Sequence, residues 1–190
     1  MELSKLGYCA LANYECLCLK PYLDSGGVKT VGVGSTISDI PDLPLWDWNK
    51  EISIEEAVRL YKKGLSKYVA AVNKELTRLE IPQTLFDALV SITYNIGTGN
   101  TKTNVGGMAG STFMKRVNAG ESLERIVQAM AAWNKDNGKV VQGLINRRKK
   151  EANLILHGDY GTKGLVDLVP VVNKKPVYSK ATKINLLDYL

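Results

Sequence analysis

The chain has 190 residues, 45% hydrophobic and 23% charged, so it can bury a core without disulfides or a structural metal. Its 25 basic and 19 acidic residues give a formal net charge of +6, which favours anionic partners such as nucleic acid, membrane surfaces or cell-wall polymers without choosing among them. The beginning carries Glu2, Lys5 and Glu15, and no later stretch reaches membrane-spanning length, so the sequence predicts neither a signal peptide nor a transmembrane segment.

The three cysteines, Cys9, Cys16 and Cys18, lie close together near the start of the chain. An odd number confined to one segment does not make a disulfide framework, so we expect reduced thiols, buried as small apolar side chains. A thiol-based switch beside Glu15 is the alternative. His157 is the single histidine, and no Cys–His pattern with metal-ligand spacing is present.

The first elements predicted are a short helix and a small sheet. Residues 4–16 have mixed helical spacing, and Pro21 prevents the helix from continuing. In residues 22–33 the SGG triplet favours a turn, and VKTVGVG alternates as in a small antiparallel sheet. The segment SDIPDLPLWDWNKE, residues 38–51, contains two prolines and several acids and is expected to form a loop.

Helical patterns dominate after this loop. Ser53 is expected to cap a long amphipathic helix, because apolar residues recur at steps of three or four from Val58 to Leu76. A second helix follows Pro82 and ends at the GTGN of residues 97–100. Apolar side chains cover most of its circumference, so we expect it at the buried centre of a helical lobe.

The last third of the chain begins with helices and then changes character. Ser111 is a predicted cap for a helix in FMKRVNAG, and further helices are predicted over residues 122–134 and 141–157. Beyond Tyr160, short β-branched runs are interrupted by two prolines. This tail is expected either to pack as an extended strap or to serve a partner.

Two carboxylates and a threonine stand out in the segment ANYECLCLKPYLDSGGVKTVGVGST. Glu15 closes the first predicted helix, Asp24 precedes the glycine turn, and Thr30 follows it. Glycoside hydrolysis needs one carboxyl group that donates a proton and one that stays ionised, and different surroundings can create that difference. Glu15 would be the shielded acid and Asp24 the solvated carboxylate. On spacing alone, Asp24 is equally an ordinary turn residue.

The string E-x8-D-x5-T, set within YLDSGGVKTVGVG, resembles the active-site signature of the phage-type lysozyme (endolysin) family. Matching blocks follow in the same order, namely LFDALVSITYNIGTG, STFMKRVNAG, AAWNKDNGKVVQGLINRRKKEANLIL and HGDY, so the resemblance spans about residues 6–160. It implies an α+β, mostly helical, two-lobed fold. Residues 1–160 would be the catalytic domain, with a small β-hairpin lobe at about 15–55 and a helical lobe at about 80–160. Residues 161–190 would be a C-terminal extension of unknown role.

Enzymes of this family cleave the β-1,4 bond between N-acetylmuramic acid and N-acetylglucosamine in bacterial peptidoglycan. The resemblance makes Glu15 the general acid, while Asp24 and Thr30 would position the attacking water on the opposite face of the sugar. Such chemistry inverts the anomeric carbon and implies a carboxyl separation of about 6.5–9.5 Å, whereas about 5 Å would indicate a covalent route. We therefore expect a glycoside hydrolase that serves host cell lysis and needs no metal or organic cofactor.

The resemblance also implies supporting residues. Tyr22, Tyr94 and Asn95 take substrate-binding positions, suited to sugar rings and N-acetyl groups. Arg147 aligns with an arginine that reaches back to the catalytic glutamate. The alternative for Arg147 and Arg148 is an exposed basic helix face, and we expect one of the two to be exposed, since adjacent helical residues point in different directions.

Two positions depart from the family pattern. Cys16 stands where many relatives have glycine, and Ser35 stands where many have histidine. Neither change touches the three predicted catalytic residues.

Trp46 and Trp48 are expected to seal the proline-rich loop on the sheet rather than to stack on glycan, and Trp133 is expected in the core of the helical lobe.

Three rival interpretations stay open. A lytic transglycosylase-like reaction on the same bond would use Glu15 alone and yield an anhydro sugar, and a non-catalytic wall-binding module would keep only the fold. A nucleic-acid binder rests on net charge alone, and no recognised motif supports it. We expect peptidoglycan glycan strands as the partner, a monomer, no nucleic acid and no stable membrane insertion. The enzyme would be made in the host cytoplasm and act on the cell wall after release.

Overall fold

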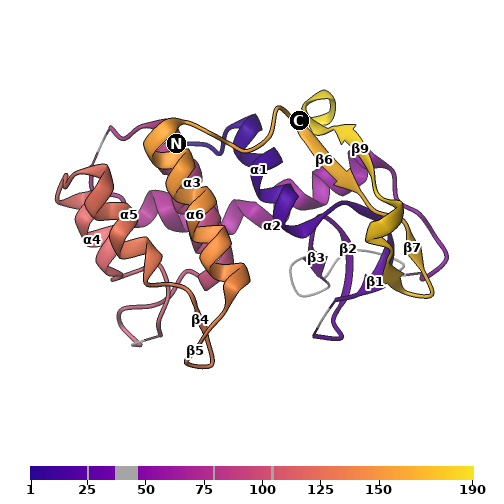
Figure 1. Ribbon diagram of the computed structural model, residues 1–190, viewed down its shortest axis with the longest axis horizontal. Helices are drawn as coiled ribbons and strands as arrows, with labels where there is room; N and C mark the ends of the chain where they lie inside the picture. Colours follow the sequence, from indigo (N-terminus) through magenta and orange to yellow (C-terminus); the bar gives the residue numbers. More distant parts are fainter. Residues whose placement is uncertain (25, 37–46, 79, 104) are drawn as a thin grey trace. The chain divides into compact units, whose positions relative to one another are not determined.

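The computed structural model describes residues 1–24, 26–36, 47–78, 80–103 and 105–190 (Figure 1). They divide into two compact units, and we call residues 1–7 and 67–161 unit 1 and residues 8–66 and 162–190 unit 2. Of the loop predicted over residues 38–51, only residues 47–51 are described, and they contain no helix or strand. No helix in the described part of the chain has both the length and the apolar character needed to cross a membrane.

The small antiparallel sheet of unit 2 follows the first helix. Helix α1 (Lys5–Glu15) precedes β1 (Cys18–Leu23), β2 (Lys29–Gly32) and β3 (Ser35–Thr36), which pair in that order. The ladder between β1 and β2 is irregular from Cys18 to Tyr22. Pro21 lies in this irregular stretch, where its missing N–H costs no ladder hydrogen bond. The helix and sheet predicted from the sequence are both confirmed.

The C-terminal extension is built into unit 2. It forms two antiparallel strand pairs, β6 (Leu165–Leu168) with β9 (Thr182–Asn185) and β7 (Val171–Val172) with β8 (Lys175–Pro176). Two short 3-10 helices, Tyr178–Lys180 and Leu186–Tyr189, complete it.

Backbone hydrogen bonds fasten the extension to both ends of β1. The Leu17 N–H donates to the Asp167 carbonyl at 2.9 Å, and the Val169 N–H donates to the Leu17 carbonyl at 2.8 Å. The Leu23 N–H donates to the Lys174 carbonyl at 3.0 Å. The strand pairs of the tail are sheets of their own, and the strands β7 and β8 pack against β1 (Figure 1).

Long helices dominate the rest of the chain. Helix α2 (Ile54–Glu75) has residues in both units, and α3 (Gln83–Ile96) lies in unit 1. The Ser53 hydroxyl accepts a hydrogen bond from the Glu56 N–H at 3.1 Å, so the predicted cap of α2 is confirmed. Residues 85–93 of α3 are all buried, as expected for the centre of a helical unit.

Three more helices of unit 1 follow α3 in the chain, namely α4 (Thr112–Asn118), α5 (Leu123–Ala131) and α6 (Gln142–His157). The Ser111 hydroxyl accepts from the Met114 N–H at 3.2 Å, which confirms the second predicted cap. Helix α5 ends three residues before the prediction, because the following chain enters a hairpin of β4 (Lys135–Asp136) and β5 (Lys139–Val140). Helix α3 packs against α6, and α4 packs against α5.

A buried carboxylate joins the two ends of unit 1. Asp87 of α3 accepts hydrogen bonds from the Ser4 N–H at 3.1 Å, the Tyr160 hydroxyl at 2.8 Å and the Gln83 amide at 2.7 Å. A side chain at Gly7 would bring its Cβ within 2.8 Å of Asp87, so only glycine lets α1 approach this closely. Asp87 thus ties the N-terminal residues and the segment after α6 to the centre of the unit.

Candidate active site

Asp24 is held at the turn between β1 and β2. Its Oδ1 accepts hydrogen bonds from the backbone N–H groups of Gly26 and Val28, each at 2.8 Å, and its own N–H donates to the Val28 carbonyl at 3.0 Å. Neither side-chain bond uses Oδ2. The turn therefore fixes the orientation of the carboxylate through one oxygen, and the ordinary turn role and the predicted catalytic role are compatible.

Thr30 lies on the same hairpin, two residues into β2. It pairs with Tyr22 of β1 on one side and with Thr36 of β3 on the other, and it is 2% exposed. Its Oγ1 donates a hydrogen bond to the Val28 carbonyl at 3.1 Å. Because the hydroxyl hydrogen is used in this bond, the oxygen can act only as an acceptor towards a further partner.

Glu15 is the last residue of α1 and is partly exposed. The next residue, Cys16, has a φ of 58°, and its N–H donates to the Ala12 carbonyl at 2.9 Å, which closes the final turn of the helix. The left-handed conformation at Cys16 ends α1 and directs the chain into β1. Glu15 therefore sits at a helix terminus defined by backbone geometry, in the same unit as Asp24 and Thr30.

The conformation of Cys16 explains why glycine suits this position, at which the chain departs from the family pattern. A φ between +20° and +160° is favourable for glycine and strained for residues with a Cβ. Cys16 retains its place by packing: it is 8% exposed, and its Sγ lies 3.7 Å from the Sγ of Cys18. With Tyr22 and Val169, these two cysteines form a buried cluster.

The three cysteines are buried and free, as expected. Burial raises the pKa of the Cys9 thiol to about 11, so this thiol stays protonated at neutral pH. The pKa of Cys16 is lowered by hydrogen bonds from Cys18 and then from Tyr178, whereas the contact with Cys16, together with burial, raises the pKa of Cys18.

We expect Cys16→Gly and Cys16→Val to have different effects on stability. Glycine relieves the positive φ but removes the buried thiol, so the free energy of unfolding should change by about 1 kcal/mol or less. Valine keeps an apolar side chain but is β-branched in a left-handed conformation, so it should destabilise by about 2 kcal/mol. Urea denaturation followed by circular dichroism measures both. Equal losses for the two variants would show that the backbone at Cys16 is not strained.

Of the predicted substrate-binding residues, Tyr22 lies in unit 2, where it is 6% exposed within the cysteine cluster. Tyr94 and Asn95 lie in unit 1, as does the supporting residue Arg147. The ring of Tyr94 packs edge-to-face on Tyr68 with 5.1 Å between centroids. The Asn95 Oδ1 accepts a hydrogen bond from Arg148 at 3.0 Å, which fixes the orientation of its amide. Arg147 is 9% exposed and Arg148 is 4% exposed. The expectation that one of these two arginines is exposed is therefore wrong.

Glu151 is the reason that both arginines are buried. It lies three and four residues after them on α6, and the Nε of Arg148 is 2.7 Å from its Oε2, while the Nε of Arg147 is 3.6 Å from its Oε1. The Ser91 hydroxyl of α3 donates to Oε1 at 2.7 Å. Burial raises the pKa of Glu151, and the Arg148 guanidinium opposes this.

The sequence interpretation missed Glu151. The signal was present in NRRKKE, because residues three and four apart face each other on a helix. The cluster of Glu151, Ser91 and the two arginines also reaches a predicted substrate-binding residue, because Arg148 donates a hydrogen bond to Asn95.

The tryptophans take different positions. Trp133 packs edge-to-face against Phe113 of α4, with 6.4 Å between centroids. Trp48 lies beneath two ammonium groups, Lys29 Nζ at 4.1 Å and Lys174 Nζ at 4.5 Å, so its indole links β2 to the extension through cation–π contacts. Trp46 lies outside the described residues. Ser35, the second departure, is buried in β3.

The sequence is similar to known cell-wall enzymes. Residues 12–151 match the family described as phage lysozyme. Over 161 residues the chain is 32% identical to the endolysin of Bacillus phage B103, covering 84% of this chain and 56% of that protein. The chain thus spans about half the length of the Bacillus phage endolysins that it matches.

Two solved structures give the same result. The endolysin from Escherichia coli O157:H7 phage FAHEc1 is 38% identical, with a TM-score of 0.70, and the match covers 84% of this chain and 96% of that one. The muramidase domain of SpmX from Asticaccaulis excentricus is 29% identical, with a TM-score of 0.64 and coverage of 82% and 97%. These similarities confirm the predicted lysozyme-like α+β fold. The chain therefore belongs to the phage lysozyme family, a family of glycoside hydrolases, as its sequence predicted.

Proposed function

We propose that this chain is a muramidase that hydrolyses the β-1,4 bond between N-acetylmuramic acid and N-acetylglucosamine in peptidoglycan, with inversion at the anomeric carbon. The observation that carries the proposal is the presence of the complete Glu15, Asp24 and Thr30 set within the family match over residues 12–151. A non-catalytic wall-binding protein would have no need to keep all three.

The hairpin geometry supports a division of roles between the three residues. Glu15 protonates the leaving glycosidic oxygen as the general acid. Asp24, fixed through Oδ1, uses Oδ2 to accept a proton from the attacking water and to stabilise positive charge at the anomeric carbon. Thr30 accepts the second water hydrogen, because its own hydrogen is donated to Val28. Together, Asp24 and Thr30 orient the lone pair of the water towards carbon.

The supporting roles of Tyr22, Tyr94, Asn95 and Arg147 rest on the resemblance and are part of the proposal. So is the biological setting, in which the enzyme acts on the wall after release from the host cytoplasm and contributes to lysis. The net charge of +6 would favour association with anionic wall polymer, and added salt should slow that encounter.

The products of digested peptidoglycan test the reaction. We expect a reducing-end muramic acid that carries one added water, detected by mass spectrometry, and we expect the α-anomer to appear first in NMR spectra, since inversion requires it. A 1,6-anhydro product would instead establish the transglycosylase alternative. Initial release of the β-anomer would show retention, and hence a covalent route through Asp24.

A further inference from the structure

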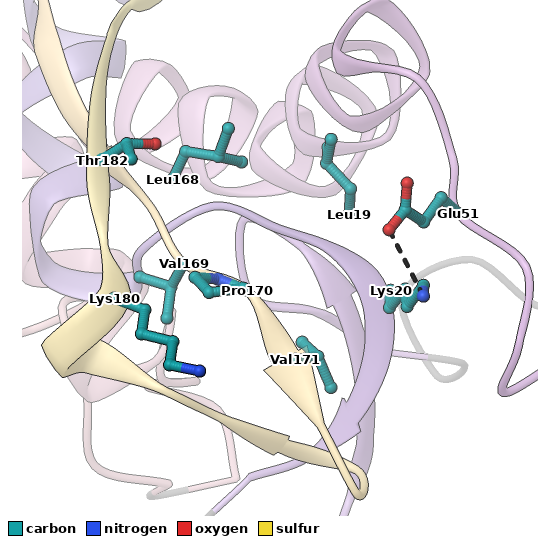
Figure 2. Close-up of a pocket in the computed structure, with 9 residues that line it drawn as sticks. All are labelled: Leu19, Lys20, Glu51, Leu168, Val169, Pro170, Val171, Lys180 and Thr182. Carbon is teal, nitrogen blue, oxygen red and sulfur yellow. Dashed lines mark ion pairs between the residues drawn. The ribbon is translucent and has the colours of Figure 1, made fainter.

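Unit 2 contains a pocket of about 420 Å³ between β1 and the C-terminal extension (Figure 2). Its size is within the range of small-molecule sites in proteins. Six of its nine lining residues belong to residues 168–182, beyond the residues 12–151 that match the family. The pocket is therefore a feature of this chain that the predicted catalytic residues do not account for.

An irregular stretch of β1 contributes to one wall of the pocket, and backbone hydrogen bonds hold both walls. Leu19 and Lys20 lie in the irregular stretch of β1, and such bulges redirect side chains out of a regular ladder. The Leu19 carbonyl accepts from the Ile52 N–H at 2.9 Å. On the opposite wall, the Pro170 carbonyl accepts from the Val177 N–H at 2.9 Å. Both walls are thus held by the fold itself, so the pocket is formed before any ligand arrives.

The interior of the pocket is aliphatic. Leu19, Leu168, Val169, Pro170 and Val171 line it, and no aromatic side chain is among the described lining residues. Sugar rings are commonly bound on aromatic faces, so this lining does not suit a second glycan site. It suits small aliphatic side chains, which lose unfavourable contact with water when they enter.

The charged groups lie at two ends of the pocket. At one end the Nζ of Lys20 is 3.4 Å from the Oε1 of Glu51, with side chains 38% and 62% exposed, and Lys180 lies at the other end (Figure 2). Such an exposed pair is weak and can open for a competing partner. Lys180 forms no ion pair with any residue that the structure describes. The rim thus has one cation more than it has carboxylates.

We propose that this pocket binds the C-terminal end of a short peptide of small aliphatic residues, with the free carboxylate of the peptide at Lys180. The aliphatic lining would accept the methyl side chains, and Glu51 would be available to an ammonium group further along the peptide. The stem peptides of uncross-linked peptidoglycan have this chemistry, because they end in D-alanine and carry a diamino residue. The biological setting rests on the proposed function, but the binding chemistry does not.

Binding of the tripeptide acetyl-Lys-D-Ala-D-Ala to the full chain tests the proposal, measured by calorimetry and by NMR chemical shifts. We expect the free carboxylate form to bind at least about tenfold more tightly than its C-terminal amide, because the charge-assisted hydrogen bond to Lys180 is lost with the amide. Lys180→Ala should weaken binding of the carboxylate form by a similar factor. Lys175→Ala, an exposed lysine of β8 outside the pocket, should leave it unchanged.

A second variant tests the pocket itself. Thr182 lines the pocket from an exposed position of β9, so Thr182→Trp should fill the cavity without disturbing the core and should abolish binding. Equal binding of carboxylate and amide, unchanged binding in Lys180→Ala, or no binding by the folded wild type would each overturn the proposal. The proposal would also be overturned if anionic phospholipid vesicles or acetate bound with the same affinity as the peptide, because either result would show a site for any anion.

The test separates this proposal from the muramidase assignment. Peptide binding is measured without turnover and should be the same in Glu15→Gln. Binding of the tripeptide without release of glycan fragments would support the peptide site and contradict the proposed muramidase reaction. Glycan cleavage without peptide binding would support the reaction and contradict the peptide site.

Discussion

Glu15→Gln should reduce the clearing of a cell-wall suspension by about 100- to 10,000-fold, which is the usual contribution of a general acid. The amide has nearly the same shape as the carboxyl group but cannot donate a proton of suitable acidity to the glycosidic oxygen. The rate of turbidity loss at equal protein concentration measures the effect, and circular dichroism and the thermal midpoint confirm that the variant is folded. Clearing at the wild-type rate would remove Glu15 from the mechanism.

Asp24→Asn tests the second predicted catalytic carboxylate, and a closely matched variant at another turn serves as its control. The asparagine Oδ1 can accept the same two backbone hydrogen bonds, so the turn should survive while the negative charge is lost. We expect a loss of activity similar to that of Glu15→Gln. Asp47→Asn is the control, because the Asp47 Oδ1 accepts a bond from the N–H two residues later at 2.9 Å but carries no proposed role. A loss in both variants would indicate a general effect of removing turn carboxylates.

Glu151→Ala should have the largest effect on stability, lowering the free energy of unfolding by about 3–5 kcal/mol. The reason is that Arg148, with 3% of its side chain exposed, would remain buried without its anionic partner. Urea denaturation measures the loss. The double variant Glu151→Leu with Arg148→Met should recover part of it, because it removes the Arg148 charge together with its partner, whereas Arg147 still loses its contact with Glu151. The cycle gives the coupling energy between positions 148 and 151.

Arg59 and Glu56 provide a control for the burial argument. They have the same three-residue spacing on a helix and the same 2.7 Å separation, but their side chains are 60% and 37% exposed. Glu56→Ala should therefore change stability by about 1 kcal/mol or less. If Glu151→Ala were equally mild, water or a rearranged partner would have to satisfy Arg148, and the buried cluster would not be a stabilising element.

Local signals predicted the helices and the hairpin that carries Asp24 and Thr30. Ser53 and Ser111 mark helix starts because a hydroxyl cap acts within three residues, and the alternation after Asp24 marks strands for the same local reason. The end of α5 was misplaced because helical periodicity continues through Trp133, while the chain has already entered a hairpin. Which continuation is adopted depends on packing outside that segment.

Long-range contacts could not be predicted in the same way. The tail has no periodic pattern, and one of the contacts that fasten it is a parallel bridge between Leu17 and Leu168, which are far apart in the sequence. The burial of Arg148 also depends on three-dimensional surroundings, namely Ser91 on α3 and Glu151 on its own helix. By contrast, Glu15, Asp24 and Thr30 could be proposed as catalytic residues from the sequence, because they lie within one short motif.

The bridge between Leu17 and Leu168 has a consequence for how the protein is made. Residues 8–66 emerge from the ribosome long before residues 162–190 are synthesised, yet both segments belong to the same compact unit. Cys18 and Tyr22 of the early segment are buried in a cluster with Val169 of the late segment. The hydrophobic cluster of unit 2 therefore cannot be completed until the late segment has been synthesised. In a nascent chain, the unit that carries the three predicted catalytic residues would therefore stay incompletely folded until the strands of residues 162–190 have been synthesised.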